Sequence, residues 1–478
     1  MKFYMINSNI LINFILFITL VIGIVLRLYN INYDNLWIDE MATFWVSDPS
    51  INFSEMIERH KATELAPQFY YVIIYSLHKI FGYSPEVGRY FSSFIGILSI
   101  FSSGYLIKII VKNNAYKLGI FLISFNVFLI SYSMEMRTYM LMFFISTLSF
   151  IVIFKYLEIK KNYLLFLFFI IQICLTLTHP FSLIIFASIL ILPIYQYINN
   201  HPLEKNFIIT LIITGIAILL ITYLHYSNLK IGSDYLWNEQ PGLKFYTNFY
   251  FSQYFGSRLL GIVHLLLLLF LIFKLRTFLF KNYYLIILLS LLILSYFVPL
   301  MYGLYKPIIT SKYIIFVLIP IIILLSVLIY EIKSKIIKNF IISLIILITF
   351  TNQFTEQNFK QFLEERKYFK PQYSLALKYI NDSNNNNYYV DLNFAKTENL
   401  KKNYLLIYKN YLNFISKQNN YNQLKYISNS EVNNEYNEIW ILCSYLVYGE
   451  NCKKTKSDQT ILDEKQFQNL YLTLIKID

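Results

Sequence analysis

The chain has 478 residues, of which 56% are hydrophobic and 14% are charged, and its formal net charge is +13. This number of charged residues is too small to form the surface of a water-soluble protein. The composition therefore excludes water-soluble proteins and indicates a membrane protein. The positive charge gathers in loops on one side of the membrane and in a lysine-rich tail, so no nucleic-acid partner is needed to explain it.

Residues 1–352 predict an all-α polytopic membrane domain. Apolar segments near the roughly 20 residues that cross a bilayer recur through this region, and we count about eleven. Every second connection is rich in lysine, which places those connections and the N-terminus in the cytoplasm of a multi-pass protein of the plasma (inner) membrane. The predicted spans are residues 10–29, 86–107, 118–133, 137–155, 163–178, 181–198, 206–225, 257–273, 283–301, 313–330 and 336–352.

The first outer loop carries two adjacent acids, Asp39 and Glu40, in the stretch "NLWIDEMATFWVS" at 35–47. Apolar residues every three positions and two flanking tryptophans predict a short helix in the membrane interface. Paired carboxylates at headgroup depth suit a reaction in which one accepts a proton from a hydroxyl and the other orients the acceptor or raises its neighbour's pKa. The alternative is a solvated loop with ordinary interfacial anchors.

A second interfacial helix is predicted at 65–80, where a proline, a histidine and a lysine argue against a span. A serine, a proline and a glutamate at 84–86 then begin the second span. Within that span Gly88, Ser92 and Gly96 are small residues at four-residue spacing, which predicts close packing against a neighbouring helix.

Ionisable residues stand at the outer ends of later spans. Glu135 and Arg137 lie where the third and fourth spans meet, and such groups are costly there unless they are paired or functional. Arg137 is a candidate for neutralising a lipid phosphate; the alternative is an ion pair with Glu135 or Glu64. Lys312, at the start of the tenth span, is a second phosphate-binding candidate. His179 precedes a helix-breaking proline and is a candidate for substrate binding; the alternative is an exposed interfacial histidine.

Residues 353–478 predict a small α/β domain, because short apolar runs typical of strands alternate with helical patterns. An odd number of spans places this domain outside the cytoplasm. An oxidising compartment there would allow a Cys443–Cys452 disulfide, and the alternative is two separate thiols.

Neither a glycine-rich nucleotide-binding loop nor a dense histidine and cysteine cluster occurs in the sequence. We therefore predict no cofactor and no metal ligands, although the sequence neither requires nor excludes a divalent metal.

Five motifs in order resemble those of polyprenyl-phosphate-sugar-dependent glycosyltransferases: the protein O-mannosyltransferase, lipid A aminoarabinose transferase and RgtA/B/C/D-like superfamily, which has the GT-C fold. They are "LWIDEMATFW" (36–45), "ELAPQFYYVIIYSLHKIFGYSPEVGRYFSSFIGILSI" (64–100), "SYSMEMRTYML" (131–141), "LTLTHPFSLI" (175–184) and "TSKYIIFVLIP" (310–320). The resemblance covers essentially the whole chain, including the tail.

This resemblance implies an inverting glycosyltransferase that moves a sugar from a polyprenyl-monophosphate donor to a hydroxyl of a glycan, lipid or protein acceptor at the outer face of the membrane. Asp39 and Glu40 would be catalytic. The implied substrate-binding residues are Glu64, Glu135, Arg137, His179 and Lys312. The sequence departs from the family where Lys312 replaces the usual arginine, and where "LAP" replaces a pair of prolines after Glu64.

Three other interpretations remain. A flippase or transporter would carry its ionisable residues near the middle of the membrane, whereas the acids here lie at the outer rim. A lipid-linked glycan ligase or polymerase would require a diphosphate-linked oligosaccharide donor. A membrane scaffold or receptor would carry its partner-binding residues in the tail, where the sequence shows no distinctive motif beyond the two cysteines.

Overall fold

The structure is a computed structural model that describes residues 8–200, 202, 204–228, 252–305, 310–354, 370–392, 398–427, 437–444 and 460–476. Cys452 lies outside these ranges, so the Cys443–Cys452 disulfide stays a prediction. The chain forms two compact units. One, which we call the membrane unit, comprises residues 1–29, 65–70 and 88–366. The other comprises residues 30–64, 71–87 and 367–478, and we call it the outer unit after the side of the membrane that the sequence predicts for it.

The membrane unit is helical. Because a bilayer offers no hydrogen-bonding partners, a chain this apolar satisfies its backbone within helices. Its helices are α1 (Ser8–Leu28), α5 (Pro85–Ile110), α6 (Ala115–Ser124), α7 (Val127–Ser133), α8 (Tyr139–Ile159), α9 (Asn162–Thr176), η1 (Pro180–Ser182), α10 (Leu183–Ile189), α11 (Ile191–Ile198), α12 (Lys205–Ser227), α14 (Ser252–Phe255), α15 (Arg258–Lys274), α16 (Arg276–Lys281), α17 (Tyr283–Tyr305), η3 (Ser311–Val317), α18 (Leu318–Tyr330), α19 (Lys335–Thr351) and η4 (Asn352–Phe354).

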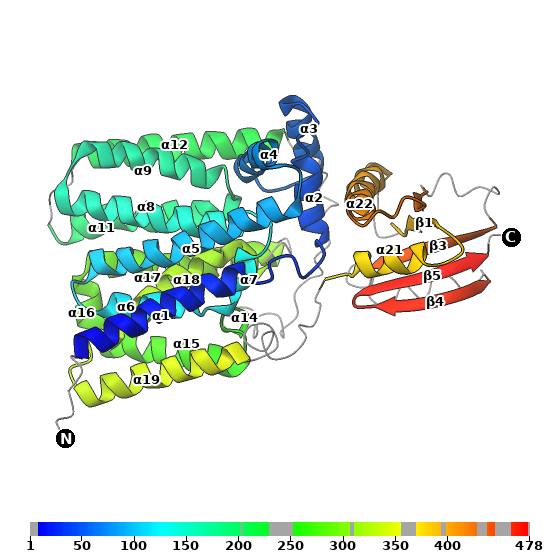
Figure 1. The fold of residues 1–478 in the computed structure, drawn as a ribbon. Coiled ribbons are helices and arrows are strands. Elements are labelled where there is room, and N and C mark those ends of the chain that lie inside the picture. The colour runs from blue at the N-terminus through cyan, green and yellow to red at the C-terminus, as the bar shows by residue number, and fades with distance from the viewer. Residues whose placement is uncertain are drawn as a thin grey trace, which may run out of the picture. The chain divides into compact units, whose positions relative to one another are not determined.

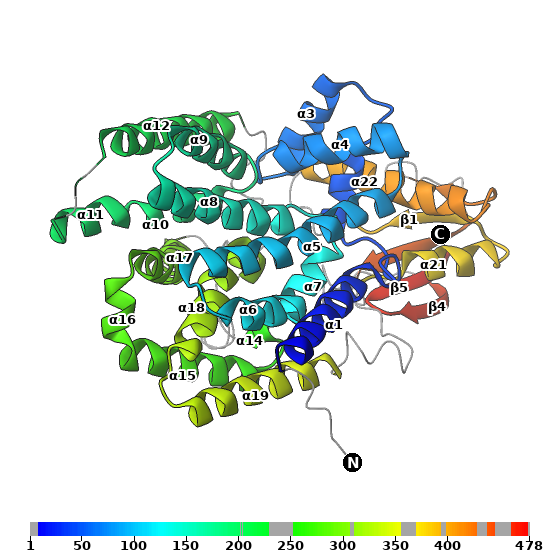
Figure 2. The same ribbon diagram turned by 60° about the vertical axis from the view of Figure 1, so that its left-hand side comes forward.

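Each predicted span coincides with helical structure in this list. Among the described residues, six helical segments are long and apolar enough to cross a membrane, and the bent pair of α6 and α7 would make a seventh. α1 and α9 contribute shorter apolar helices. The helices lie side by side in Figures 1 and 2, with α9 and α12 adjacent at one edge and α19 at another. The protein is therefore a multi-pass membrane protein.

α18 forms the core of the membrane unit, because every residue from Leu318 to Ile329 is buried. Around it, α1 contributes one ionisable residue to the interior. Arg27 is fully buried and donates to the carbonyl oxygens of Ile123 and Ser124 at 2.9 and 3.1 Å, where α6 ends. Carbonyls at a helix end lack partners within the helix. The Arg27 guanidinium therefore supplies hydrogen bonds to the backbone carbonyls that the break between α6 and α7 leaves without helical partners.

The small residues of α5 pack closely, as their spacing predicts. A Cβ atom added to Gly88 would collide with Met136, and one added to Gly96 would collide with Ser133. Both neighbours lie at the connection from α7 to α8, which also contains Arg137. The glycines of α5 thus allow the backbone to approach the loop that carries this candidate site residue.

The outer unit combines two parts of the chain that are far apart in sequence. From the first loop come α2 (Ile38–Val46), α3 (Phe53–Thr63) and α4 (Phe69–Phe81), which include both predicted interfacial helices. The tail supplies an α/β fold made of α21 (Tyr373–Asn381), α22 (Glu398–Gln418), β1 (Asn387–Val390), β2 (Lys425–Tyr426), β3 (Glu438–Ser444), β4 (Ile461–Phe467) and β5 (Leu470–Lys476).

The sheet of the tail has the order β2-β1-β3-β5-β4. β1 pairs in parallel with β2 and β3, whereas β5 pairs antiparallel with β3 and β4. β3 is buried along almost its whole length, because its run "EIWILCS" is apolar on both faces, while most of β4 is exposed at the sheet edge. This is the mixed α/β domain that the tail's sequence predicts.

α2 packs on α22 within the outer unit. The Phe44 ring of α2 is fully buried, stacks on Tyr83 at 3.9 Å and meets Phe414 of α22 edge-on at 5.2 Å. Just before α2, the Leu36 N–H donates to the Tyr411 hydroxyl at 2.9 Å. The tail therefore holds the helix that carries the paired acids.

Candidate active site

Asp39 and Glu40 occupy the first turn of α2. The Trp37 N–H donates to Glu40 Oε2 at 3.3 Å, so the carboxylate satisfies a backbone donor at the start of the helix. Both acids lie at the positive end of the helix dipole, where negative side chains stabilise a helix. Asp39 is half-buried, whereas the Glu40 side chain has no exposed surface. The two neighbours thus have different environments despite sharing one turn.

Lys370 of the tail binds Glu40 in the same unit. Its Nζ donates to Glu40 Oε2 at 2.6 Å, and the lysine is only 9% exposed. Removing two charges from water is costly unless they pair well. The ion pair between Glu40 and Lys370 therefore offsets the desolvation cost of both side chains. Gln372 fixes this segment, because its Nε2 donates to the Lys370 carbonyl at 2.9 Å and to Asp34 Oδ1 at 3.0 Å.

The sequence gives no signal for Lys370. It is one lysine in a lysine-rich tail and lies far from the motif that it supports. With Lys370 bound to Glu40, the Glu40 carboxylate is suited to positioning the turn, while the half-buried Asp39 carboxylate is suited to proton transfer.

Glu64 lies in the outer unit at the end of α3. It is 5% exposed, and its N–H donates to the His60 carbonyl at 2.9 Å. Close by in the chain, the Ala62 carbonyl accepts a bond from Asn403 of α22 at 3.3 Å. The tail therefore contacts this end of α3 as well as α2.

A cluster of cations forms in the membrane unit around Tyr139, the first residue of α8. The Arg137 guanidinium carbon lies 5.9 Å from the centre of the Tyr139 ring, and Lys312 Nζ lies 5.5 Å from it. Lys312 comes from η3, so two segments far apart in sequence bring their charges to one ring. Glu135 is half-buried in the preceding turn, where its carbonyl accepts the Arg137 N–H at 2.8 Å.

His179 lies beside these two cations, and we call the three residues together the cation cluster (the charged Arg137 and Lys312 with His179). Its ring lies 5.2 Å from Tyr313 and 6.2 Å from Tyr139. Burial, together with the nearby Arg137 and Lys312 charges, lowers the pKa of His179 to about 3. The Phe181 N–H donates to Nδ1 at 3.3 Å. Both observations indicate a neutral imidazole whose Nε2 carries the proton.

The structure thus brings Arg137, His179 and Lys312 together in the membrane unit. Glu135 lies in the same loop as Arg137. It places Asp39, Glu40 and Glu64 in the outer unit. The positive potential that acts on His179 is the kind that binds a phosphate oxygen, and an imidazole N–H beside two cations adds a neutral donor. Sequence reasoning missed Tyr139 and Tyr313, although both stand within the motifs at 131–141 and 310–320.

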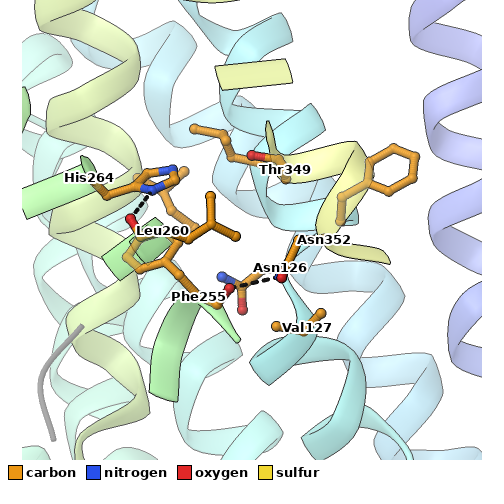
Figure 3. Close-up of a pocket in the computed structure, with 10 residues that line it drawn as sticks. Asn126, Val127, Phe255, Leu260, His264, Thr349 and Asn352 are labelled. Carbon is orange, nitrogen blue, oxygen red and sulfur yellow. Dashed lines mark hydrogen bonds between the residues drawn. The ribbon is translucent and has the colours of Figure 1, made fainter. Parts of the chain in front are cut away.

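A narrow cavity at the break between α6 and α7 lies within the membrane unit and contains none of the predicted site residues. It is lined by Asn126, Asn352 and His264 among other residues, and has room for about one water molecule. In Figure 3 the polar groups bond to backbone carbonyls: Asn352 Nδ2 donates to Phe255 at 2.8 Å, and His264 Nδ1 lies 2.8 Å from the Leu260 oxygen. The polar side chains of this cavity therefore serve the backbone around the helix break, and we do not assign them a role in binding a substrate.

Within the described ranges, no group of three or more histidine, cysteine, aspartate or glutamate side chains is arranged to hold a metal ion.

Searches against protein-family models and against curated protein sequences find no match. Solved structures do match. ArnT from Cupriavidus metallidurans bound to undecaprenyl phosphate aligns with a TM-score of 0.53 at 9% identity, over 98% of each chain. The apo form of the Archaeoglobus fulgidus oligosaccharyltransferase aligns with a TM-score of 0.54 at 10% identity, over 92% of this chain and 70% of that one. These likenesses confirm the predicted GT-C fold.

Proposed function

We propose, starting from the GT-C fold, that this membrane protein is an inverting glycosyltransferase that uses a polyprenyl-monophosphate sugar as its donor. The cation cluster is the observation that carries the proposal. Arg137 and Lys312 flank one tyrosine ring beside a neutral histidine, and a phosphate monoester or diester suits such a group. The structural neighbour ArnT was solved with undecaprenyl phosphate bound, which supports a lipid phosphate as the ligand.

The cation cluster would hold the donor phosphate and stabilise it as it leaves. When the bond between the anomeric carbon and the phosphate oxygen breaks, the electron pair passes to that oxygen. Arg137 and Lys312, already in place, would stabilise the added charge, and the His179 Nε2–H would donate to it. A fixed donor of this kind contributes about 3–4 kcal/mol to the lowering of a reaction barrier.

Asp39 would act as the general base. Its carboxylate takes the proton of an acceptor hydroxyl, and the hydroxyl oxygen attacks the anomeric carbon from the side opposite the phosphate, which inverts the configuration. Glu40, held by Lys370 at 2.6 Å, would position the turn that carries Asp39. Glu64 and Glu135 would bind the sugar or the acceptor. The donor's own phosphate bond supplies the free energy of transfer, so the proposal includes no cofactor.

The location of the reaction follows from the charge of the loops. We place the N-terminus in the cytoplasm and the acids, the cation cluster and the tail on the outer side of the plasma (inner) membrane. The acceptor would be a glycan, a lipid or a protein that meets the membrane on that side.

The test is transfer of radiolabelled sugar from a panel of synthetic polyprenyl-monophosphate sugars to a membrane extract. We expect transfer by the wild type and transfer reduced about 10²- to 10⁴-fold in Asp39→Asn, with normal expression of both. Glu55→Gln is the matched control, because Glu55 is an exposed acid of the same loop that pairs with Arg59. Transfer that is undiminished in Asp39→Asn would remove the general-base assignment. Transfer only from diphosphate-linked oligosaccharides would favour a ligase.

A further inference from the structure

The membrane unit has a charged hollow at the end remote from the cation cluster. α8 runs along the bundle (Figure 1), from Tyr139 at the cation cluster to Lys155 and Glu158 at this hollow. At about 1.5 Å per residue, Lys155 lies roughly 24 Å along the helix from Tyr139. α18 likewise ends here, at Tyr330. The hollow is thus a separate feature, which the proposed reaction does not use.

Basic residues dominate the lining of this hollow. Lys108, Lys112, Lys155 and Lys338 line it, and Glu158 is the one acid among its described lining residues. Lys155 Nζ pairs with Glu158 at 2.7 Å, which leaves the hollow with a clear excess of positive charge. The lysines come from α5, the loop after it, α8 and α19, so several elements converge on one anion-binding space.

Tyrosines surround these lysines. Tyr105, Tyr116 and Tyr330 line the same hollow, and Lys108 Nζ lies 6.0 Å from the Tyr116 ring. Lys338 Nζ lies 5.9 Å from the Tyr330 ring and donates to the Tyr330 carbonyl at 3.1 Å. Tyrosine favours the level of lipid headgroups because its ring is apolar and its hydroxyl is polar. The hollow therefore offers both the positive charge and the hydroxyl groups that a lipid headgroup can bind.

An exposed aromatic stripe leads from α5 into the hollow. Tyr90, Phe94, Phe101 and Tyr105 are 49%, 56%, 47% and 48% exposed, respectively. Their spacings of four, seven and four residues place them on one face of the helix, and Lys108 follows on the same face. In a membrane helix such a face contacts acyl chains. A lipid bound here can thus lay its chain along the stripe while its headgroup enters the hollow, whereas a soluble phosphate would use only the lysines.

We propose that this hollow binds the phosphate headgroup of an anionic phospholipid. The lysines neutralise the phosphate, the tyrosine hydroxyls donate to its oxygens, and an acyl chain packs on the aromatic stripe of α5. Basic pockets between membrane helices recognise anionic headgroups in this way. The site would anchor the lysine-rich end of the helix bundle by binding an anionic lipid, and this binding would not depend on the transfer reaction.

The test uses the full-length protein in vesicles of phosphatidylcholine that contain a small share of spin-labelled phosphatidylglycerol. The fraction of label that is immobilised by the protein is compared with that of spin-labelled phosphatidylcholine. The pocket variant carries Lys108→Gln, Lys112→Gln and Lys338→Gln. The control variant carries Lys161→Gln, Lys274→Gln and Lys335→Gln, which are exposed lysines outside the hollow. Both variants lose the same charge, so general attraction to an anionic membrane is matched.

We expect the wild type and the control variant to immobilise phosphatidylglycerol several-fold more than phosphatidylcholine, and the pocket variant to lose that preference. Inorganic phosphate at high concentration should not displace the lipid label. Equal preference in all three proteins would overturn the site. Displacement by inorganic phosphate would overturn the lipid assignment in favour of a soluble phosphate compound. Phe101→Ala should weaken the preference without any change in charge, and an unaltered preference would contradict the role of the stripe.

Discussion

The membrane unit and the outer unit hold their functional charges in different ways. In the membrane unit, Arg137 and Lys312 lie beside the Tyr139 ring, and burial together with these two positive charges holds the pKa of His179 far below its ordinary value. In the outer unit, Glu40 is fully buried against Lys370. The first arrangement concentrates positive charge around aromatic rings, and the second neutralises a buried acid. Under the proposed function, the membrane unit would bind the donor and the outer unit would fix the geometry of the base.

The largest effect is expected at Asp39. Asp39→Asn keeps the shape of the side chain and removes its ability to accept a proton, so we expect the rate of sugar transfer to fall about 10²- to 10⁴-fold. The affinity for the donor should stay unchanged, because the phosphate is assigned to the membrane unit. Single-turnover rates at saturating donor measure the first effect, and equilibrium binding of the donor measures the second.

The next effect concerns the buried pair of the outer unit. Lys370→Met leaves Glu40 buried without this partner, and loss of one member of such a pair costs about 3–5 kcal/mol of stability. Thermal unfolding should show this loss, and the double variant Glu40→Gln with Lys370→Met should recover most of it. Equal stability of the single and double variants would mean that the pair does not support α2.

A pH dependence follows from His179. Because its pKa is lowered from an ordinary value near 6.5 to about 3, the folded protein binds this proton less readily than the unfolded chain does. The stability contributed by the neutral ring is therefore complete above about pH 6.5 and is lost as the pH falls toward 3. Between pH 6.5 and 5 the loss is roughly 2 kcal/mol, at 1.36 kcal/mol per unit.

This prediction is checked by unfolding the wild type and His179→Gln at pH 7 and pH 5. The variant should lose less stability on acidification than the wild type. Identical losses would show that another group titrates in this range. Nitrogen NMR of labelled histidine should also find the Nε2–H tautomer at pH 7.

The smallest effect is expected at Lys312. Lys312→Arg introduces a planar group that can bind phosphate through two parallel hydrogen bonds, so donor affinity should stay within about tenfold of the wild type, or rise. Lys312→Gln should weaken it. Lys333→Gln is the control, because Lys333 is an exposed residue just beyond the other end of α18. Donor binding that falls equally in both glutamine variants would mean that general charge, and not this position, attracts the donor.

The two regions also differ in how far the sequence predicts them. The apolar spans and the cations at their ends were predictable, because composition and local motifs specify them. The α/β character of the tail followed from the alternation of short apolar runs. The packing of α2 on α22 was not predictable, because Phe44 with Phe414, or Glu40 with Lys370, joins residues more than 300 positions apart in the sequence. No local pattern marks such pairs.

The most direct test measures donor binding and transfer side by side in Asp39→Asn and Arg137→Gln. We expect Asp39→Asn to bind a polyprenyl-monophosphate sugar as tightly as the wild type and to transfer it about 10²- to 10⁴-fold more slowly. Arg137→Gln should bind it about 10- to 100-fold more weakly, since one charge-assisted hydrogen bond contributes about 1.5–3 kcal/mol. Donor affinity that is unaltered in Arg137→Gln, or lost in Asp39→Asn, would contradict the division of roles between the two units.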